Sequence, residues 1–188
     1  MMLTTLPILI TERLALRPFD LADAPAVQVL ASAPEIADTT LGLPYPYPED
    51  GAAAWIGTHP ASVGKGLYPF AMVRKQDNVL LGTMSIGTDP RHNKGELAYW
   101  VGVPHWNQGY ATEAARRVVQ WAFEDLGLNR IFARYLVRNP ASGRVMNKAG
   151  LVPEGTFVQD VLKWGVYEDV GQCGLVQAEY QRLTNKAL

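Results

Sequence analysis

The segment from residue 96 to residue 127 constrains the fold of this chain more than any other stretch. It opens with ELAYWVGV, a strand-like run that Pro104 ends. A long amphipathic helix is expected from Gly109 to Leu126, with Gly127 after its last turn. The strand-like run RIFARYLV follows at residues 130–137. A chain that alternates strands and helices in this way must pack helices against a sheet.

The flanking segments extend this pattern to the whole sequence. Asp20 is expected to cap a first helix, and Pro140 to open a short helix over residues 139–150. We further predict a helix near residues 49–59 and strands at 13–19, 66–75, 78–88, 151–164 and 166–180. The sequence therefore predicts an α/β (α+β) fold in one domain, residues 1–188. Its mixed central sheet has six to seven strands, flanked by about four helices.

Composition excludes several classes of function. The net charge of −1 lacks the basic footprint of a dedicated nucleic-acid binder. The lone cysteine, Cys173, can form neither an intrachain disulfide nor a cysteine-based zinc site, and the three histidines have no metal-ligand spacing. No signal peptide or membrane span is visible. We expect a cytoplasmic protein that binds no metal, nucleic acid or membrane.

The beginning of the long helix is a candidate anion site. Helix N-termini present unpaired amides with partial positive charge, and these bind phosphates. A glycine at position 109 lets a phosphate approach the backbone closely. Neither a Walker loop nor a dinucleotide fingerprint is present. The alternative is that Gly109 simply ends a loop.

A second group of polar residues surrounds the start of the helix at 139–150. Asn139 is placed to cap this helix. Ser142 and Arg144 add a hydroxyl and a guanidinium near the same helix mouth. Such groups are suited to bind a polar, phosphorylated chain, although capping and solvation explain them equally well.

Together these segments resemble the acetyl-CoA site of the GNAT superfamily of N-acetyltransferases. WNQGYATEA resembles its pyrophosphate loop, and RNPASGRVMNKAGLVPEGT resembles its Asn-x-x-Ser segment and the turn after it. ITERLALRPF, ELAYWV and Trp106 resemble the RimJ/RimL branch, which includes ribosomal-protein N-terminal acetyltransferases. The sequence departs from the common pattern at Trp106, Ala111, Leu151 and Cys173. Of these, Cys173 stands at a position that tyrosine often occupies in this branch.

The resemblance implies a GNAT fold, acetyl-CoA as cosubstrate and a set of contacts with it. Trp100, Val101 and Val103 would pair with the pantetheine arm, chiefly through main-chain atoms of the two valines. Asn139 would bond the same arm, and Arg144 would reach the 3′-phosphate unless it is merely solvated. The pyrophosphate would lie on Gln108, Gly109, Tyr110, Ala111 and Thr112.

The resemblance also implies catalytic roles. Glu96 is the candidate for activating the amine, because a partly buried carboxylate accepts protons well; the alternative is a solvent-facing glutamate at a strand start. Ser142 is the candidate for protonating the leaving thiolate, or else fills the first turn of its helix. Asp160 is a weaker candidate base. Cys173 is expected to be a buried small residue rather than a nucleophile.

The expected function is therefore acetyl transfer from acetyl-CoA to a primary amine, either a protein N-terminus or a small molecule. The alternative is an acyl-CoA-binding sensor or partner protein that has the same fold without turnover. The acceptor should be selected by the proline-rich segment 41–55, where Tyr45, Tyr47 and Trp55 predict an aromatic mouth or a packed lid. No acidic cluster is visible there, which disfavours polyamines. A homodimer is expected from the resemblance alone.

Overall fold

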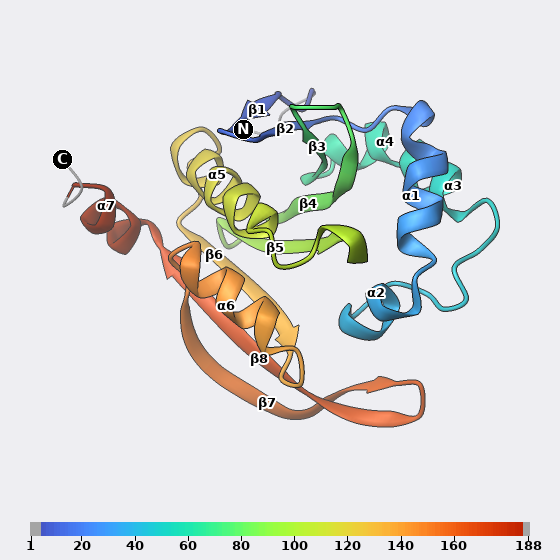
Figure 1. The fold of residues 1–188 in the computed structure, drawn as a ribbon. Helices are drawn as coiled ribbons and strands as arrows, with labels where there is room; N and C mark the ends of the chain where they lie inside the picture. The colour runs from blue at the N-terminus through green and yellow to red at the C-terminus, as the bar shows by residue number, and fades with distance from the viewer. Residues whose placement is uncertain (1–4, 186–188) are drawn as a thin grey trace.

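The computed structural model describes residues 5–185, which form one sheet with helices on both faces (Figure 1). In chain order the elements are β1 (Leu9–Ile10), β2 (Leu14–Arg17), η1 (Leu21–Asp23), α1 (Ala24–Ala31), α2 (Pro34–Thr39), α3 (Gly51–Gly57), α4 (His59–Val63), β3 (Leu67–Arg74), β4 (Leu80–Asp89), β5 (Lys94–Val101), η2 (Val103–His105), α5 (Tyr110–Glu124), β6 (Arg130–Leu136), α6 (Pro140–Lys148), β7 (Val152–Lys163), β8 (Val166–Val176) and α7 (Gln177–Asn185).

The eight strands have the order β1-β2-β3-β4-β5-β6-β8-β7. All neighbours are antiparallel except β5 and β6, which are parallel and pair only between Lys94–Glu96 and Arg130–Phe132. Beyond these residues β5 stays paired with β4, and β6 with β8, so the two central strands separate (Figure 1). The sheet is therefore open between β5 and β6 from Leu97 to the end of β5 at Val101.

Alternating side chains of the strands feed two cores, one on each face of the sheet. Phe70 and Met72 of β3 pack with buried residues of α5, including Val118 and Trp121. Their strand neighbours Ala71 and Val73 belong to a second cluster with α1, α2 and α3. This alternation is what the two-residue period of a strand requires when both faces are covered.

Three helix starts follow the sequence closely. The Asp20 side chain accepts from the Ala22 amide and forms a reciprocal capping box with Asp23. Asn139 caps α6 by accepting from the Ser142 amide. Gly109 precedes α5 with φ of 81°, a left-handed conformation that glycine adopts without steric cost.

The predicted fold class is confirmed, with additions. The structure has the expected strands plus the short β1, and it adds α2, α4 and α7 to the expected helices. The last strand was predicted to reach Tyr180, and this is wrong because β8 ends at Val176. The following QAEYQRL is rich in helix formers, and the Tyr180 ring stacks on Phe123 of α5 at 4.7 Å. Within the described part of the chain, no helix is both long and apolar enough to cross a bilayer.

Candidate active site

The start of α5 presents backbone amides to a groove. Glu113 is the first residue of this helix whose amide bonds back, to the Gly109 carbonyl. The amides of Tyr110, Ala111 and Thr112 precede that bond, and glycine has no side chain with which to cap them. The helix mouth is thus a set of donors with positive partial charge, as an anion site requires.

Arg13 of the Thr11–Leu14 turn fixes the loop that enters this helix. Its guanidinium donates to the Gln108 carbonyl at 2.9 Å and lies 4.5 Å from the centre of the Tyr110 ring. Glu113 binds the same guanidinium at 2.7 Å and accepts from the Thr11 hydroxyl at 2.6 Å. Burial opposes ionisation of Glu113, but these hydrogen bonds outweigh it and lower the pKa of the carboxyl. The carboxylate near the helix mouth is therefore neutralised by Arg13.

The separated end of β5 offers free main-chain atoms. Gly102 donates to Leu81 of β4, and the Ala98 carbonyl accepts from Ser85 of β4, so even-numbered residues face β4. In an antiparallel ladder the intervening residues, Tyr99 and Val101, then point their amides and carbonyls to the open side. The Val101 carbonyl is already bound there by the Trp106 indole.

The helix mouth and the open strand edge line one groove of 390 Å³. Thr39 and Thr40 close it from the other side, at the end of α2. The groove includes most of the residues predicted to hold a cofactor: Trp100, Val101, Gly109, Tyr110, Ala111, Thr112, Asn139, Ser142 and Arg144.

A second cavity of 620 Å³ lies against β5, α3 and the proline-rich segment. Glu96, Ala98 and Trp100 contribute from one face of the strand, and Tyr47 and Trp55 from the segment opposite. This cavity and the groove share the residues Thr39, Thr40, Tyr99, Trp100 and Ser142. The two spaces therefore meet where β5 and β6 separate.

A pair of hydroxyl groups lies at the junction. The Tyr99 and Ser142 oxygens are 2.9 Å apart, and either hydroxyl can be the donor. Burial raises the pKa of Tyr99 to about 12, while the bond to Ser142 opposes this rise. The phenol is therefore protonated at neutral pH. Sequence reasoning missed Tyr99, because its bond to Ser142 joins a strand to a helix 43 residues later.

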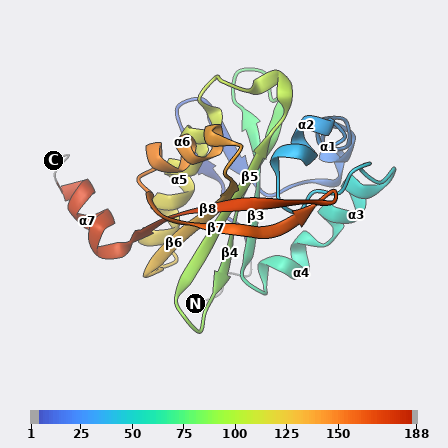
Figure 2. The ribbon, with the colours of Figure 1, turned by 90° about the horizontal axis from the view of Figure 1, so that it is seen from below.

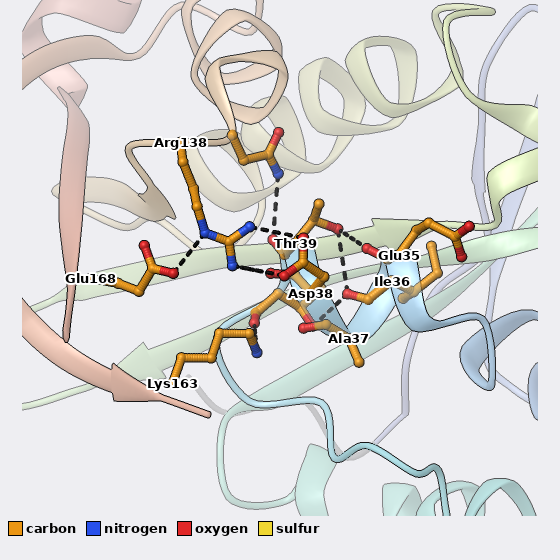
Figure 3. Close-up of polar contacts among 10 residues, drawn as sticks. Glu35, Ile36, Ala37, Asp38, Thr39, Arg138, Lys163 and Glu168 are labelled. Atoms are coloured by element: carbon orange, nitrogen blue, oxygen red, sulfur yellow. Dashed lines mark hydrogen bonds and ion pairs between the residues drawn. The ribbon is translucent and has the colours of Figure 1, made fainter. Parts of the chain in front are cut away.

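Ion pairs hold the segment that closes both spaces (Figure 3). Arg138 donates to both carboxylate oxygens of Asp38 at 2.8 and 2.9 Å and to Glu168 at 2.7 Å. Lys163, near the tip of the β7–β8 hairpin, donates to the Thr40 carbonyl at 2.8 Å. Figure 2 shows this hairpin reaching across toward α2 and α3. The end of α2 is thus tied to β6–α6 and to the hairpin.

Comparison with known proteins decides the family, because the acetyltransferase (GNAT) domain matches residues 13–152. The chain belongs to the GNAT acetyltransferase family. It is 30% identical over 174 residues to "Uncharacterized N-acetyltransferase YoaA" of Bacillus subtilis (strain 168), covering 91% of this chain and 97% of that one. The GNAT acetyltransferase structure from Bacillus anthracis superposes with a TM-score of 0.82 at 23% identity, over 92% of this chain and 99% of that one. The spermidine N-acetyltransferase from Vibrio cholerae, solved with CoA and spermine, gives 0.79 at 21%, over 91% and 99%.

The predicted RimJ/RimL-like branch is confirmed, since the matching GNAT family is the RimJ/RimL-like one. By homology the chain is an N-acetyltransferase.

Two residues that were expected to bind the cofactor lie outside the groove. Val103 is in η2 and packs on the second core. The side chain of Gln108 donates to the Pro104 carbonyl at 3.1 Å.

The structure separates the residues considered for acid–base work. Glu96 lines the larger cavity and accepts from Arg134 Nε at 2.9 Å. Asp160 is exposed on an irregular stretch of β7 and lines neither space. Cys173 is buried in the core, and burial raises the pKa of its thiol. Of the predicted aromatic mouth, Tyr47 and Trp55 line the cavity, whereas Tyr45 packs against Trp164.

Proposed function

We propose that this chain transfers the acetyl group of acetyl-CoA to a primary amine by direct attack in a ternary complex. The observation that carries the proposal is the meeting of two cavities at the Tyr99–Ser142 pair, since one space can hold the thioester and the other the amine. A related fold, the spermidine N-acetyltransferase from Vibrio cholerae, is solved with CoA and an amine together. We also infer that residues 1–188 form one GNAT domain.

The groove supports the following mode of cofactor binding. The pyrophosphate lies on the amides of residues 110–112, where the dipole of α5 favours negative charge. The pantetheine arm pairs with the open edge of β5 at Tyr99 and Val101, as an added strand does. Arg144 and Lys148 line the same groove and are suited to the 3′-phosphate.

The chemistry begins when the neutral amine nitrogen attacks the thioester carbonyl carbon. A C–N bond forms, and the carbonyl π electrons move to oxygen, where the Tyr99 amide at the strand edge is suited to stabilise the charge, while the Val101 amide stays paired with the pantetheine arm. Collapse of this intermediate breaks the C–S bond and releases the CoA thiolate. Ser142 donates its proton to that sulfur and regains one from the Tyr99 hydroxyl, and Tyr99 is reprotonated by solvent as the products leave.

The amine loses one proton in the reaction, and Glu96 is the proposed acceptor, directly or through a water. Glu96 lines the 620 Å³ cavity proposed to hold the amine, called the acceptor cavity below, whereas Asp160 does not. Glu96 precedes Tyr99 by three residues, roughly 10 Å along the strand, so a water-mediated path is the natural one. Much of the rate enhancement can come from positioning the two substrates.

A thiol-release assay with acetyl-CoA and a panel of primary amines tests the activity. We expect CoA release that depends on both the amine and the protein. Binding of acetyl-CoA without release from any amine would contradict the proposed catalysis and favour the non-catalytic alternative.

Substituting Gly109→Glu tests the phosphate site separately. A side chain at this position would start 3.3 Å from the Arg13 guanidinium that holds the loop, would strain a residue with positive φ and would add negative charge at the helix mouth. CoA binding should therefore weaken at least 100-fold by calorimetry. Gln120→Glu adds the same charge to an exposed position of α5 and should leave binding unchanged. Retained affinity in a folded Gly109→Glu protein would refute the assignment.

A further inference from the structure

The acceptor cavity is largely apolar and carries a single pair of opposite charges. Leu43, Trp55 and Met146 are among its apolar lining residues. Among the described residues that line it, only Glu96 and Arg134 are charged. These two bind each other at 2.9 Å. A substrate that fits this cavity should therefore combine an apolar body with a charge that Arg134 can bind.

Arg134 lies where β5 and β6 separate. The last parallel pair is Glu96 with Phe132, so Arg134 lies two residues beyond the part of β6 that pairs with β5. Tyr99, which marks the junction with the cofactor groove, lies farther along β5 than Glu96. A group bound to Arg134 is thus held inside the cavity, near Glu96, on the acceptor side of the junction with the groove.

The guanidinium has donors to spare. Its Nε donates a hydrogen bond to Glu96, but within residues 5–185 the two terminal nitrogens have no hydrogen-bond partner. The side chain is 38% exposed, so a ligand can reach it. Arginine binds carboxylates through two parallel hydrogen bonds from such neighbouring N–H groups. Glu96 can meanwhile attract the ammonium form of the amine.

We propose that the acceptor is an α-amino acid with an apolar or aromatic side chain, whose carboxylate binds Arg134. This inference rests on the proposed function, because it names the substrate class of that activity. The short distance between an α-amine and its carboxylate fits the Glu96–Arg134 pair, since one group can meet Glu96 while the other binds Arg134. The apolar side chain packs against Leu43, Tyr47 and Trp55. A polyamine fits this cavity less well, because its one lining carboxylate, Glu96, is already paired with Arg134. A peptide N-terminus also fits less well, because it has no carboxylate next to the amine for Arg134 to bind.

Matched substrate pairs test the proposal. Thiol release is measured for L-leucine and L-phenylalanine against their amides, with spermidine and a tripeptide as further acceptors. The free acids should exceed their amides at least 100-fold in kcat/KM. Arg134→Gln should reduce that preference to less than fivefold, Arg134→Lys should restore part of it, and acetyl-CoA affinity should not change. Arg130→Gln is the matched control, since Arg130 lies on the same face of β6 and pairs with Glu154 outside the cavity.

Binding of N-acetyl-L-leucine to the CoA-loaded protein, measured by calorimetry, separates the two ideas. If Arg134→Gln weakens this binding tenfold or more, the carboxylate site is supported, whether or not any amine is acetylated. A failure to acetylate any amine would overturn only the proposed activity. Turnover of amides, spermidine or the tripeptide at rates equal to or above those of the free acids overturns the amino acid assignment and leaves the acetyltransferase intact. Equal product binding by Arg134→Gln and the unmodified protein overturns it as well.

Discussion

A buried histidine beside the acceptor cavity makes the free energy of unfolding sensitive to acid. His59 begins α4 and is only 7% exposed, and neither ring nitrogen has a hydrogen-bond partner within the described structure. Its ring meets Phe19 and Trp55 edge-on, with centroids 5.2 and 4.4 Å away. Trp55 also lines the acceptor cavity. Protonation of His59 would place an unpaired charge in this aromatic packing, which is unfavourable.

The size and direction of the effect follow from the pKa. Burial lowers the pKa of His59 from 6.5 to about 4, which corresponds to about 3 kcal/mol. Because the folded value is the lower one, the unfolded chain takes up the proton first as the pH falls. The contribution to stability is therefore complete above about pH 6.5 and is lost toward pH 4. About 2 kcal/mol of it should disappear between pH 7 and pH 5.

Urea unfolding at pH 7 and pH 5 measures this loss. The variant His59→Leu cannot titrate there, so its free energy of unfolding should fall about 2 kcal/mol less between the two pH values. At pH 7 the variant should be at least as stable, since it removes two unpaired buried nitrogens. His92→Gln, at an exposed site, should follow the unmodified protein. Equal losses for His59→Leu and the unmodified protein would contradict a neutral, buried His59 as the source of the acid sensitivity.

Three further substitutions separate the parts of the site. Tyr99→Phe should lower kcat about tenfold with unchanged acetyl-CoA affinity, measured by steady-state kinetics, because Ser142 then loses its hydroxyl partner. Glu113→Gln should weaken CoA binding about tenfold by calorimetry, since Arg13 would no longer be held against the phosphate loop. Arg138→Gln should raise the KM of the amine and weaken acetyl-CoA binding, each several-fold, because the end of α2 that Arg138 anchors lines both spaces; unchanged values of both would contradict this role of the anchor.

The elements of the sheet and its long helices could be predicted because their signals are local. The alternation of β2, the continuous apolar run of β3 and the long apolar stripe of α5 are visible in short windows of sequence. Helices α2 and α4 were not predicted, because stretches of six and five residues are too short to show a helical period. They form where tertiary packing buries Ile36 and Val63.

The polar contacts of the site were harder to predict, because they join distant positions. Arg13 reaches Gln108 across 95 residues, and Glu96 meets Arg134 across 38. The Glu96–Arg134 contact depends on strand register, which no local pattern reveals, and a one-residue slip would turn either side chain to the other face. The Arg13–Gln108 contact joins a turn to a loop, and neither carries a periodic signal. Glu96 could thus be proposed from sequence as a free carboxylate, while its guanidinium partner could not.

This difference between local and distant signals divides the active site by function. A phosphate is bound by consecutive amides of one helix start, so residues 109–112 carry that signal within a single motif. The acceptor cavity is instead assembled from β5, β6 and a segment that Arg138 and Lys163 hold from 100 and 123 residues away. Leu43 and Trp55 line the cavity but not the groove, so changes at such positions alter the amine side without touching the helix mouth. One cofactor site can therefore be combined with different acceptors, and Arg134, at the point where the strands separate, is placed to distinguish among them.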